Sequence, residues 1–353
     1  MIGTFTPFVE DRDVIGGDKE ILTAPLWTGT QASLKSIFTS SYQSSNQKRY
    51  YYEVYNTAST ALGAEPQFSI AYGDSKGSGS NRGTGNIDDL PTKAIYSQYK
   101  QLLLDPGNNL FTFSNGETSE YVYIVNINRS RYKDRVDTNN WQLSVGKLNA
   151  TTTSASISTG DDVFILIDDS GASTIEYTQQ GGRVFNVRSG SITDGLYTAS
   201  STVWGLFYPD NGVIVLNGKA FDASASFGTN RSPSTGSINQ NNAFRLFTSI
   251  SGAMSFNSTL YGFEGRTSEV ISSQYYYVRL FNGEYNYSIN PTFITGSIAS
   301  VKYQSMITDP VVYITTVGLY NDNQELLAVA KLSKPIQKTF QKEAVIRVKV
   351  DWW

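Results

Sequence analysis

The C-terminal stretch, residues 310–353, reads PVVYITTVGLYNDNQELLAVAKLSKPIQKTFQKEAVIRVKVDWW and predicts three β-strands. The first, Val311 to Tyr320, is rich in β-branched and aromatic residues. A polar turn at 321–323 leads to the second, Glu325 to Leu332. Apolar and polar residues alternate through the third, Ala344 to Trp352, which is the period of a half-buried strand. We therefore expect this end of the chain to be part of a sheet or an interface.

The composition also favours β-structure. Charged residues make up 17% of the 353 residues, below the usual ~25%, and Gly, Ser, Thr, Asn and Tyr are abundant. Such a mixture suits strands and turns better than helical bundles. We predict a mainly β fold, a β-sandwich or mixed antiparallel sheets with one or two short helices. The helices are expected at Thr92 to Leu104, where apolar residues recur with helical period, and near Thr30 to Phe38.

Most of the remaining chain is predicted to form short strands separated by turns. The dipeptides Asn115-Gly116, Asn211-Gly212 and Asn282-Gly283 are strong turn signals. We expect residues 1–107 to form an N-terminal α+β region completed by the strands of 300–353, with 108–299 as an inserted β-rich domain. The predicted strands outside the C-terminal stretch are 48–55, 67–72, 110–113, 121–127, 141–145, 163–167, 182–187, 202–208, 212–216, 243–249, 273–281 and 284–288.

The residue types limit the chemistry of the chain. It contains neither Cys nor His, which removes thiolate and imidazole nucleophiles, bases and metal ligands. We expect no cofactor, no metal and no catalytic residue. The net charge is −3 and Lys and Arg do not cluster, so binding to nucleic acid is not expected. No run of about 18 apolar residues is present, so no membrane insertion is expected either.

Two local features could carry chemistry. The Gly-rich stretch 73–85 follows a predicted strand, yet it lacks the spacing of a phosphate-binding loop, so we interpret it as a surface loop that orders on assembly. Paired carboxylates occur at 88–89, 161–162 and 168–169. Neighbouring residues of a strand point to opposite faces, and the last two pairs bracket the apolar run 163–167, so we interpret them as turn residues.

Tyrosine runs and the terminal tryptophans are the candidate interface residues. In each run, alternation places the middle Tyr on one face of a strand and its neighbours on the other. Tyr is enriched at protein interfaces, where its ring and its hydroxyl both find partners. The predicted interface residues are Tyr50, Tyr51, Tyr52, Gly77, Gly79, Tyr275, Tyr276, Tyr277, Trp352 and Trp353.

Several stretches resemble virion structural proteins of marine contractile-tailed phages, including cyanophages. The stretches are ITTVGLYNDNQELLAVAKLSKPI at 314–336, EAVIRVKVD at 343–351, QFSIAYG at 67–73 with GSGS at 77–80, TKAIYSQY at 92–99 and VRSGS at 187–191. The order of elements is more distantly similar to the wedge subunit of T-even-type baseplates that forms a homodimer at the wedge periphery.

The resemblance implies a structural role in the virion and supplies no catalytic residues. A baseplate wedge subunit would contact other baseplate and tail proteins and tail fibres, as a homodimer within a six-fold assembly. Two alternatives stay open. One is a neck, head-decoration or fibre-connector protein, and the other is a glycan-binding or glycan-cleaving tail module.

Overall fold

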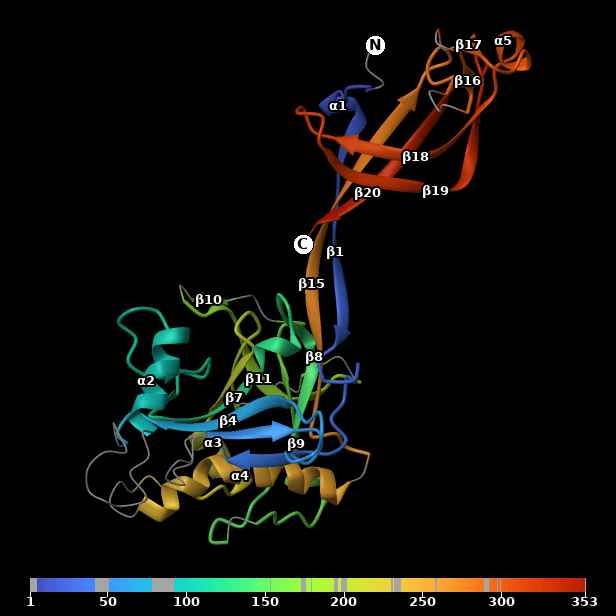
Figure 1. Cartoon of the computed structure of the whole chain (residues 1–353). Helices are drawn as coiled ribbons and strands as arrows, with labels where there is room; N and C mark the ends of the chain where they lie inside the picture. The colour runs from blue at the N-terminus through green and yellow to red at the C-terminus, as the bar shows by residue number, and fades with distance from the viewer. Residues whose placement is uncertain are drawn as a thin grey trace. The chain divides into compact units, whose positions relative to one another are not determined.

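The computed structural model is mainly β, which confirms the predicted fold class (Figure 1). The residues that it describes are 5–41, 51–77, 92–152, 154–172, 176–178, 180–193, 196–197, 202–229, 231, 236–257, 259–288, 292–296, 298 and 300–352. The strands are β1 (Val14–Pro25), β2 (Phe38–Ser41), β3 (Tyr51–Tyr55), β4 (Pro66–Asp74), β5 (Phe111–Thr112), β6 (Thr118–Ser119), β7 (Tyr121–Ile127), β8 (Arg135–Gly146), β9 (Val163–Asp168), β10 (Glu176–Thr178), β11 (Gly182–Ser191), β12 (Leu196–Tyr197), β13 (Gly205–Tyr208), β14 (Val213–Asn217), β15 (Phe263–Leu280), β16 (Ile294–Thr295), β17 (Ser300–Val301), β18 (Val312–Tyr320), β19 (Leu326–Lys338) and β20 (Ala344–Trp352). The helices are α1 (Glu10–Asp13), α2 (Thr92–Leu103), α3 (Gly218–Ala225), α4 (Gly236–Phe256) and α5 (Ser305–Thr308), with single 3₁₀ turns η1 (Arg129–Arg131) and η2 (Gly160–Asp162).

The chain divides into two compact units. The terminal unit contains Met1–Ile21 and Val270–Trp353, and the central unit contains Leu22–Glu269. This division differs from the one expected from the sequence, 1–107 with 300–353 around an inserted 108–299. The physical reason is pairing: β4 is hydrogen-bonded to β7 from Phe68 to Asp74, so strands on both sides of residue 107 belong to one sheet.

The central unit is built around an antiparallel sheet with the strand order β15-β8-β9-β11-β13-β14-β7-β4-β3-β2. One face is covered by α3 and α4, whose Phe221, Leu246 and Ile250 lie in the core on that side. The other face is covered by α2 and the β5–β6 hairpin through Tyr96 and Phe111. Because both faces are covered, every residue of β13 and β14 is buried.

The terminal unit has two packed layers. β20 pairs with β15 from Ser272 opposite Trp352 to Leu280 opposite Ala344. The β18–β19 hairpin lies over these strands, and a small apolar core forms between the layers. Along β20 the predicted alternation is confirmed from Ala344 to Asp351, because Ile346 and Val348 are buried, Ala344 and Val350 are half-buried and the residues between them are exposed. The buried members of this core are Leu280, Val317, Leu319, Ile346 and Val348.

Three predicted elements are wrong. Residues 243–249 were expected to form a strand but lie in α4, which at 21 residues is longer than the short helices expected. Residues 284–288 form no strand. Residues 30–38 form no helix, because their backbone pairs with β15 instead: Leu34 N–H donates to the Phe263 carbonyl, and Gly265 N–H donates to that of Ala32. The predicted helix at residue 92 is confirmed as α2.

Candidate functional site

A row of three polar side chains crosses the open part of the central sheet. Glu53 on β3 lies opposite Ser69 on β4, and Ser69 lies opposite Asn126 on β7. In-register residues on adjacent strands point to the same face. All three side chains are half-buried. A second row on the same face, formed by Tyr51, Ala71 and Ile124, lies two residues further along these strands. It packs in the core beneath α2.

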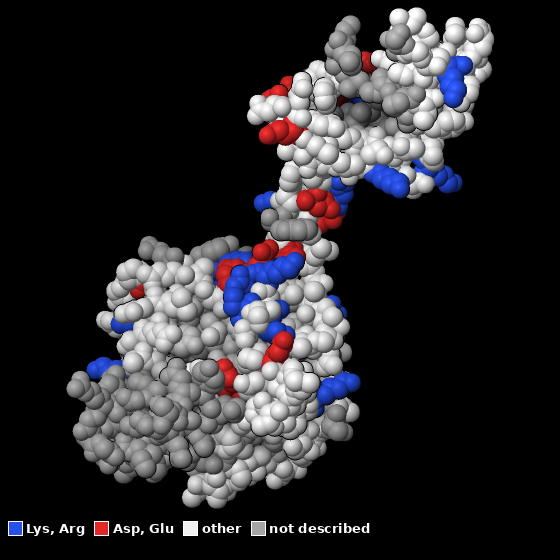
Figure 2. Space-filling model, viewed as in Figure 1, with Lys and Arg blue, Asp and Glu red and all other residues white. Residues whose placement is uncertain are grey.

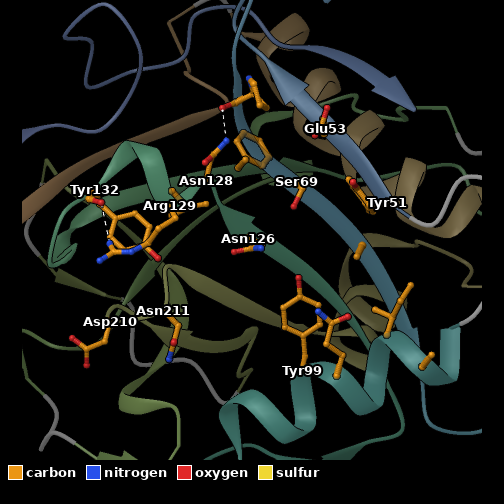
Figure 3. Close-up of a pocket in the computed structure, with 17 residues that line it drawn as sticks. Tyr51, Glu53, Ser69, Tyr99, Asn126, Asn128, Arg129, Tyr132, Asp210 and Asn211 are labelled. Carbon is orange, nitrogen blue, oxygen red and sulfur yellow. Dashed lines mark hydrogen bonds between the residues drawn. The ribbon is translucent and has the colours of Figure 1, made fainter. Parts of the chain in front are cut away.

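This polar row forms the floor of a cleft of about 780 Å³ (Figure 3). Tyr99 of α2 stands on one side of it, and Tyr51 lies at the end of β3. The opposite side carries Arg129 and Tyr132, from the segment after β7, and the β13–β14 turn. Such a volume falls within the roughly 300–1,000 Å³ that is typical of small-molecule sites.

Hydrogen bonds fix several lining side chains. The hydroxyl of Tyr99 is hydrogen-bonded to the Asn126 side chain, while burial raises the pKa of this phenol. Glu53 accepts a hydrogen bond from the Tyr55 hydroxyl at 2.5 Å. The guanidinium of Arg129 lies 4.5 Å from the ring centroid of Tyr132 and donates to the Tyr132 carbonyl at 3.0 Å. The cleft thus combines an acidic and amide floor with aromatic walls.

The predicted Tyr50–Tyr52 run divides between this cleft and the core. Tyr51 lines the cleft, whereas Tyr52 is buried and packs against Phe244 at a ring distance of 5.5 Å. Gly77 ends a described turn in which its N–H donates to the Asp74 carbonyl at 3.0 Å. The predicted residues Tyr50, Gly79 and Trp353 lie outside the described residues.

The second tyrosine run lies in the terminal unit, so the predicted site residues are not gathered in one place. Tyr276 packs against the small core there, and Tyr275 and Tyr277 point to the opposite face, as alternation predicts. The guanidinium of Arg347 lies 5.2 Å from the ring centroid of Tyr275. Trp352 is 48% exposed at the end of β20.

The carboxylate pairs beside β9 hold turns in place, as the sequence predicted. Asp168 is fully buried and accepts from the backbone N–H groups of Asn139 and Ser170, and burial raises the pKa of its carboxyl. Asp169 accepts from the backbone and the side chain of Asn186. Asp162 accepts from backbone N–H groups in its own turn, which lowers its pKa. Residues 88–89 lie outside the described residues.

An ion-pair cluster holds the start of the Gly-rich stretch. Asp74, which is buried, accepts from Nε and Nη2 of Arg231 at 2.9 and 3.0 Å and from the Lys76 backbone at 2.9 Å. Arg231 also donates to Glu120 at 2.9 Å, and its guanidinium lies 4.5 Å from the centroid of the Tyr121 ring. The Asp74 hydrogen bond is the main reason that the pKa of Arg231 is raised.

The sequence does not reveal the cleft, because its floor comes from three separate strands. Glu53, Ser69 and Asn126 stand in no common motif, and only the pairing register places them in a row. A weak signal was available at Asn126 alone, which shares a face of its predicted strand with Val122 and Ile124.

Charge and hydropathy add two observations. On the face shown in Figure 2, basic side chains lie next to acidic ones rather than in a continuous basic stripe. Within the described part of the chain, no helix combines the length and apolarity needed to cross a bilayer, and no group of three carboxylates could hold a metal ion.

The comparisons with known proteins identify no relative. No family model, curated protein or solved structure matches this chain.

Proposed function

We propose that this chain is a structural subunit of a bacteriophage contractile tail, located in the baseplate wedge, where it assembles with neighbouring tail proteins and tail fibres. It would act there as a homodimer within a six-fold assembly. The starting point is the resemblance of residues 314–336 and 343–351 to virion structural proteins. These stretches form β18, β19 and β20 of the terminal unit.

The observation that carries the proposal is an exposed apolar surface on the β18–β19 hairpin. Alternate residues of the hairpin enter the small core, and the residues between them face outward. Among these, Leu327 and Val329 are 68% and 58% exposed at one end of the hairpin, and Tyr313, opposite Gln337, is 63% exposed at the other end. Exposed apolar groups on a sheet face are typical of surfaces that a partner protein covers.

Strand β20 adds a second assembly feature. On one side it pairs with β15, and in the described sheet it has no other hydrogen-bonded neighbour. Val345, 58% exposed, lies on the face of β20 that points away from the hairpin, and Trp352, 48% exposed, lies at the end of the strand. An uncovered edge can accept a strand from another chain, which is a common mode of assembly.

Crosslinking mass spectrometry on intact particles, with copy number measured against the sheath protein, tests the location. We expect crosslinks from 312–352 to baseplate wedge proteins, at about six or twelve copies per particle as closed cyclic symmetry requires. Crosslinks to neck, capsid or fibre-connector proteins would refute the baseplate position and favour those alternatives.

A pair of variants tests the surface. Leu327→Glu with Val329→Glu places charges on the proposed interface, so incorporation into particles should fall at least about tenfold if this surface is buried in the assembly. The matched control Lys331→Glu changes an exposed position of the same strand that is already charged. Equal incorporation of both proteins would contradict the proposed surface.

A further inference from the structure

We propose that the cleft of the central unit is a binding site for a saccharide of one or two rings. The inference uses the cleft alone and stands whether or not the chain belongs to a phage tail. No metal and no catalytic step is involved.

The floor of the cleft matches the hydroxyl groups of a sugar. A sugar hydroxyl both donates and accepts hydrogen bonds, so it pairs with a carboxylate, a hydroxyl or an amide. Glu53, Ser69 and Asn126 supply one of each, in a single row. Neighbouring strands lie about 4.8 Å apart, so the row spans roughly 10 Å and can follow several hydroxyls along one sugar chain.

The walls match the apolar faces of a sugar ring. Tyr51, Tyr99 and Tyr132 come from three different elements and all line the cleft (Figure 3). Tyr51 is the most accessible of the three, because Tyr99 and Tyr132 are buried and the Arg129 guanidinium lies over the Tyr132 ring. A Tyr side chain presents an apolar ring and a polar hydroxyl together, which suits a ligand with C–H faces and hydroxyl edges. The partly buried sheet and helix α2 hold these groups in place before the ligand arrives, which limits the entropy lost on binding.

Charge excludes the main competing ligands. A phosphate or other anion would meet the carboxylate of Glu53 on the floor, which no cationic side chain neutralises among the ion pairs of the described residues. The guanidinium of Arg129 is already held against the Tyr132 ring and carbonyl. A hydrocarbon ligand would offer no partner to the donors and acceptors of the polar row that Tyr55 and Tyr99 leave unused, at a cost in affinity. A divalent cation would find a single carboxylate on the floor, because Asp210 is ion-paired with Arg183.

The first experiment uses the full chain on an array of bacterial surface oligosaccharides, followed by calorimetric titration with the strongest binder. Ser69→Phe fills the middle of the floor and should abolish binding, and Glu53→Gln should weaken it about tenfold or more by removing a charged acceptor. The controls are Ser156→Phe, which introduces the same side chain, and Asp161→Asn, which likewise replaces a carboxylate by an amide. Both lie at exposed positions of the central unit outside the cleft and should bind as the wild type does.

A measurement on the unmodified protein covers the case in which a variant fails to fold. Hydrogen exchange with the same oligosaccharide should show slower exchange in 51–55, 66–72 and 121–128, which frame the cleft. Three outcomes would overturn the proposal. The protein binds no glycan on the array, Ser69→Phe leaves glycan binding unchanged, or the glycan slows hydrogen exchange only in segments outside the cleft. Preferential binding of inorganic phosphate at the cleft would overturn it as well.

Discussion

At the scale of single residues, loss of the Asp74–Arg231 contact should destabilise the central unit. Asp74 is buried, so without its guanidinium partner the carboxylate would keep its desolvation penalty. Arg231 is one-third exposed, and solvent screening reduces the effect. We expect Arg231→Ala to lower the free energy of unfolding of the central unit by about 2–4 kcal/mol, measured by chemical denaturation.

The control for this prediction is Lys76→Ala. Lys76 forms an exposed ion pair with Glu120, and such pairs contribute about 0–1 kcal/mol. A loss for Arg231→Ala no larger than the loss for Lys76→Ala would mean that the Lys76 backbone N–H and the Tyr72 hydroxyl satisfy Asp74 without the guanidinium.

Wherever a strand is recognised in the sequence, the period of two predicts which residues share a face of the sheet. The alternation within 275–277 and the turn roles of Asp168 and Asp169 followed from the period of two and from the position of a buried strand. The burial of Tyr52 and the exposure of Tyr51 to the cleft could not be predicted, because alternation separates the two faces of a strand without saying which one is covered.

At the scale of elements, helix α2 depends on a glycine of β4. A Cβ added at Gly73 would lie 3.0 Å from both the backbone N and the Cα of Tyr96, and backbone atoms cannot rotate away. Gly73→Ala should therefore displace α2 and lower the free energy of unfolding of the central unit by about 1–3 kcal/mol. Faster hydrogen exchange within 92–103 would identify the displaced element.

The matched change for this prediction is Gly160→Ala. Its added methyl group meets no atom within 4 Å, so the free energy of unfolding should change little. Indistinguishable stability of the two variants would show that α2 adjusts to the extra methyl group without loss.

The strand pattern was predictable, and the longest helix was not. β7 and β20 occupy the residues expected, because β-branched and aromatic side chains alternate or cluster there. In α4, Ala243, Leu246, Ile250 and Ala253 are buried at helical spacing. The phenylalanines between them made the short window 243–249 resemble a strand, and only the longer window reveals the helical period.

At the scale of the whole chain, the unit boundary could not be predicted because no linker marks it. β15 begins in the central unit and ends in the terminal unit as one continuous strand of 18 residues. The predicted strand 273–281 coincides with the part of β15 in the terminal unit. The usual signals of a domain boundary are composition shifts and Pro- or Gly-rich segments. These signals are lacking where a strand continues from one unit into the next.

Each unit nevertheless has its own apolar core, which leads to a prediction about cooperativity. Ile346 is buried among the residues of the terminal unit's core, and Ile214 is buried in that of the central unit. Truncating either to Ala should cost about 2–5 kcal/mol, through lost contacts and the cavity left behind. We expect Ile346→Ala to lower one transition in differential scanning calorimetry and Ile214→Ala to lower another. If both variants instead shifted a single transition equally, the cores would have to unfold together, and the strands β1 and β15, which continue from one unit into the other, would be the elements that couple them.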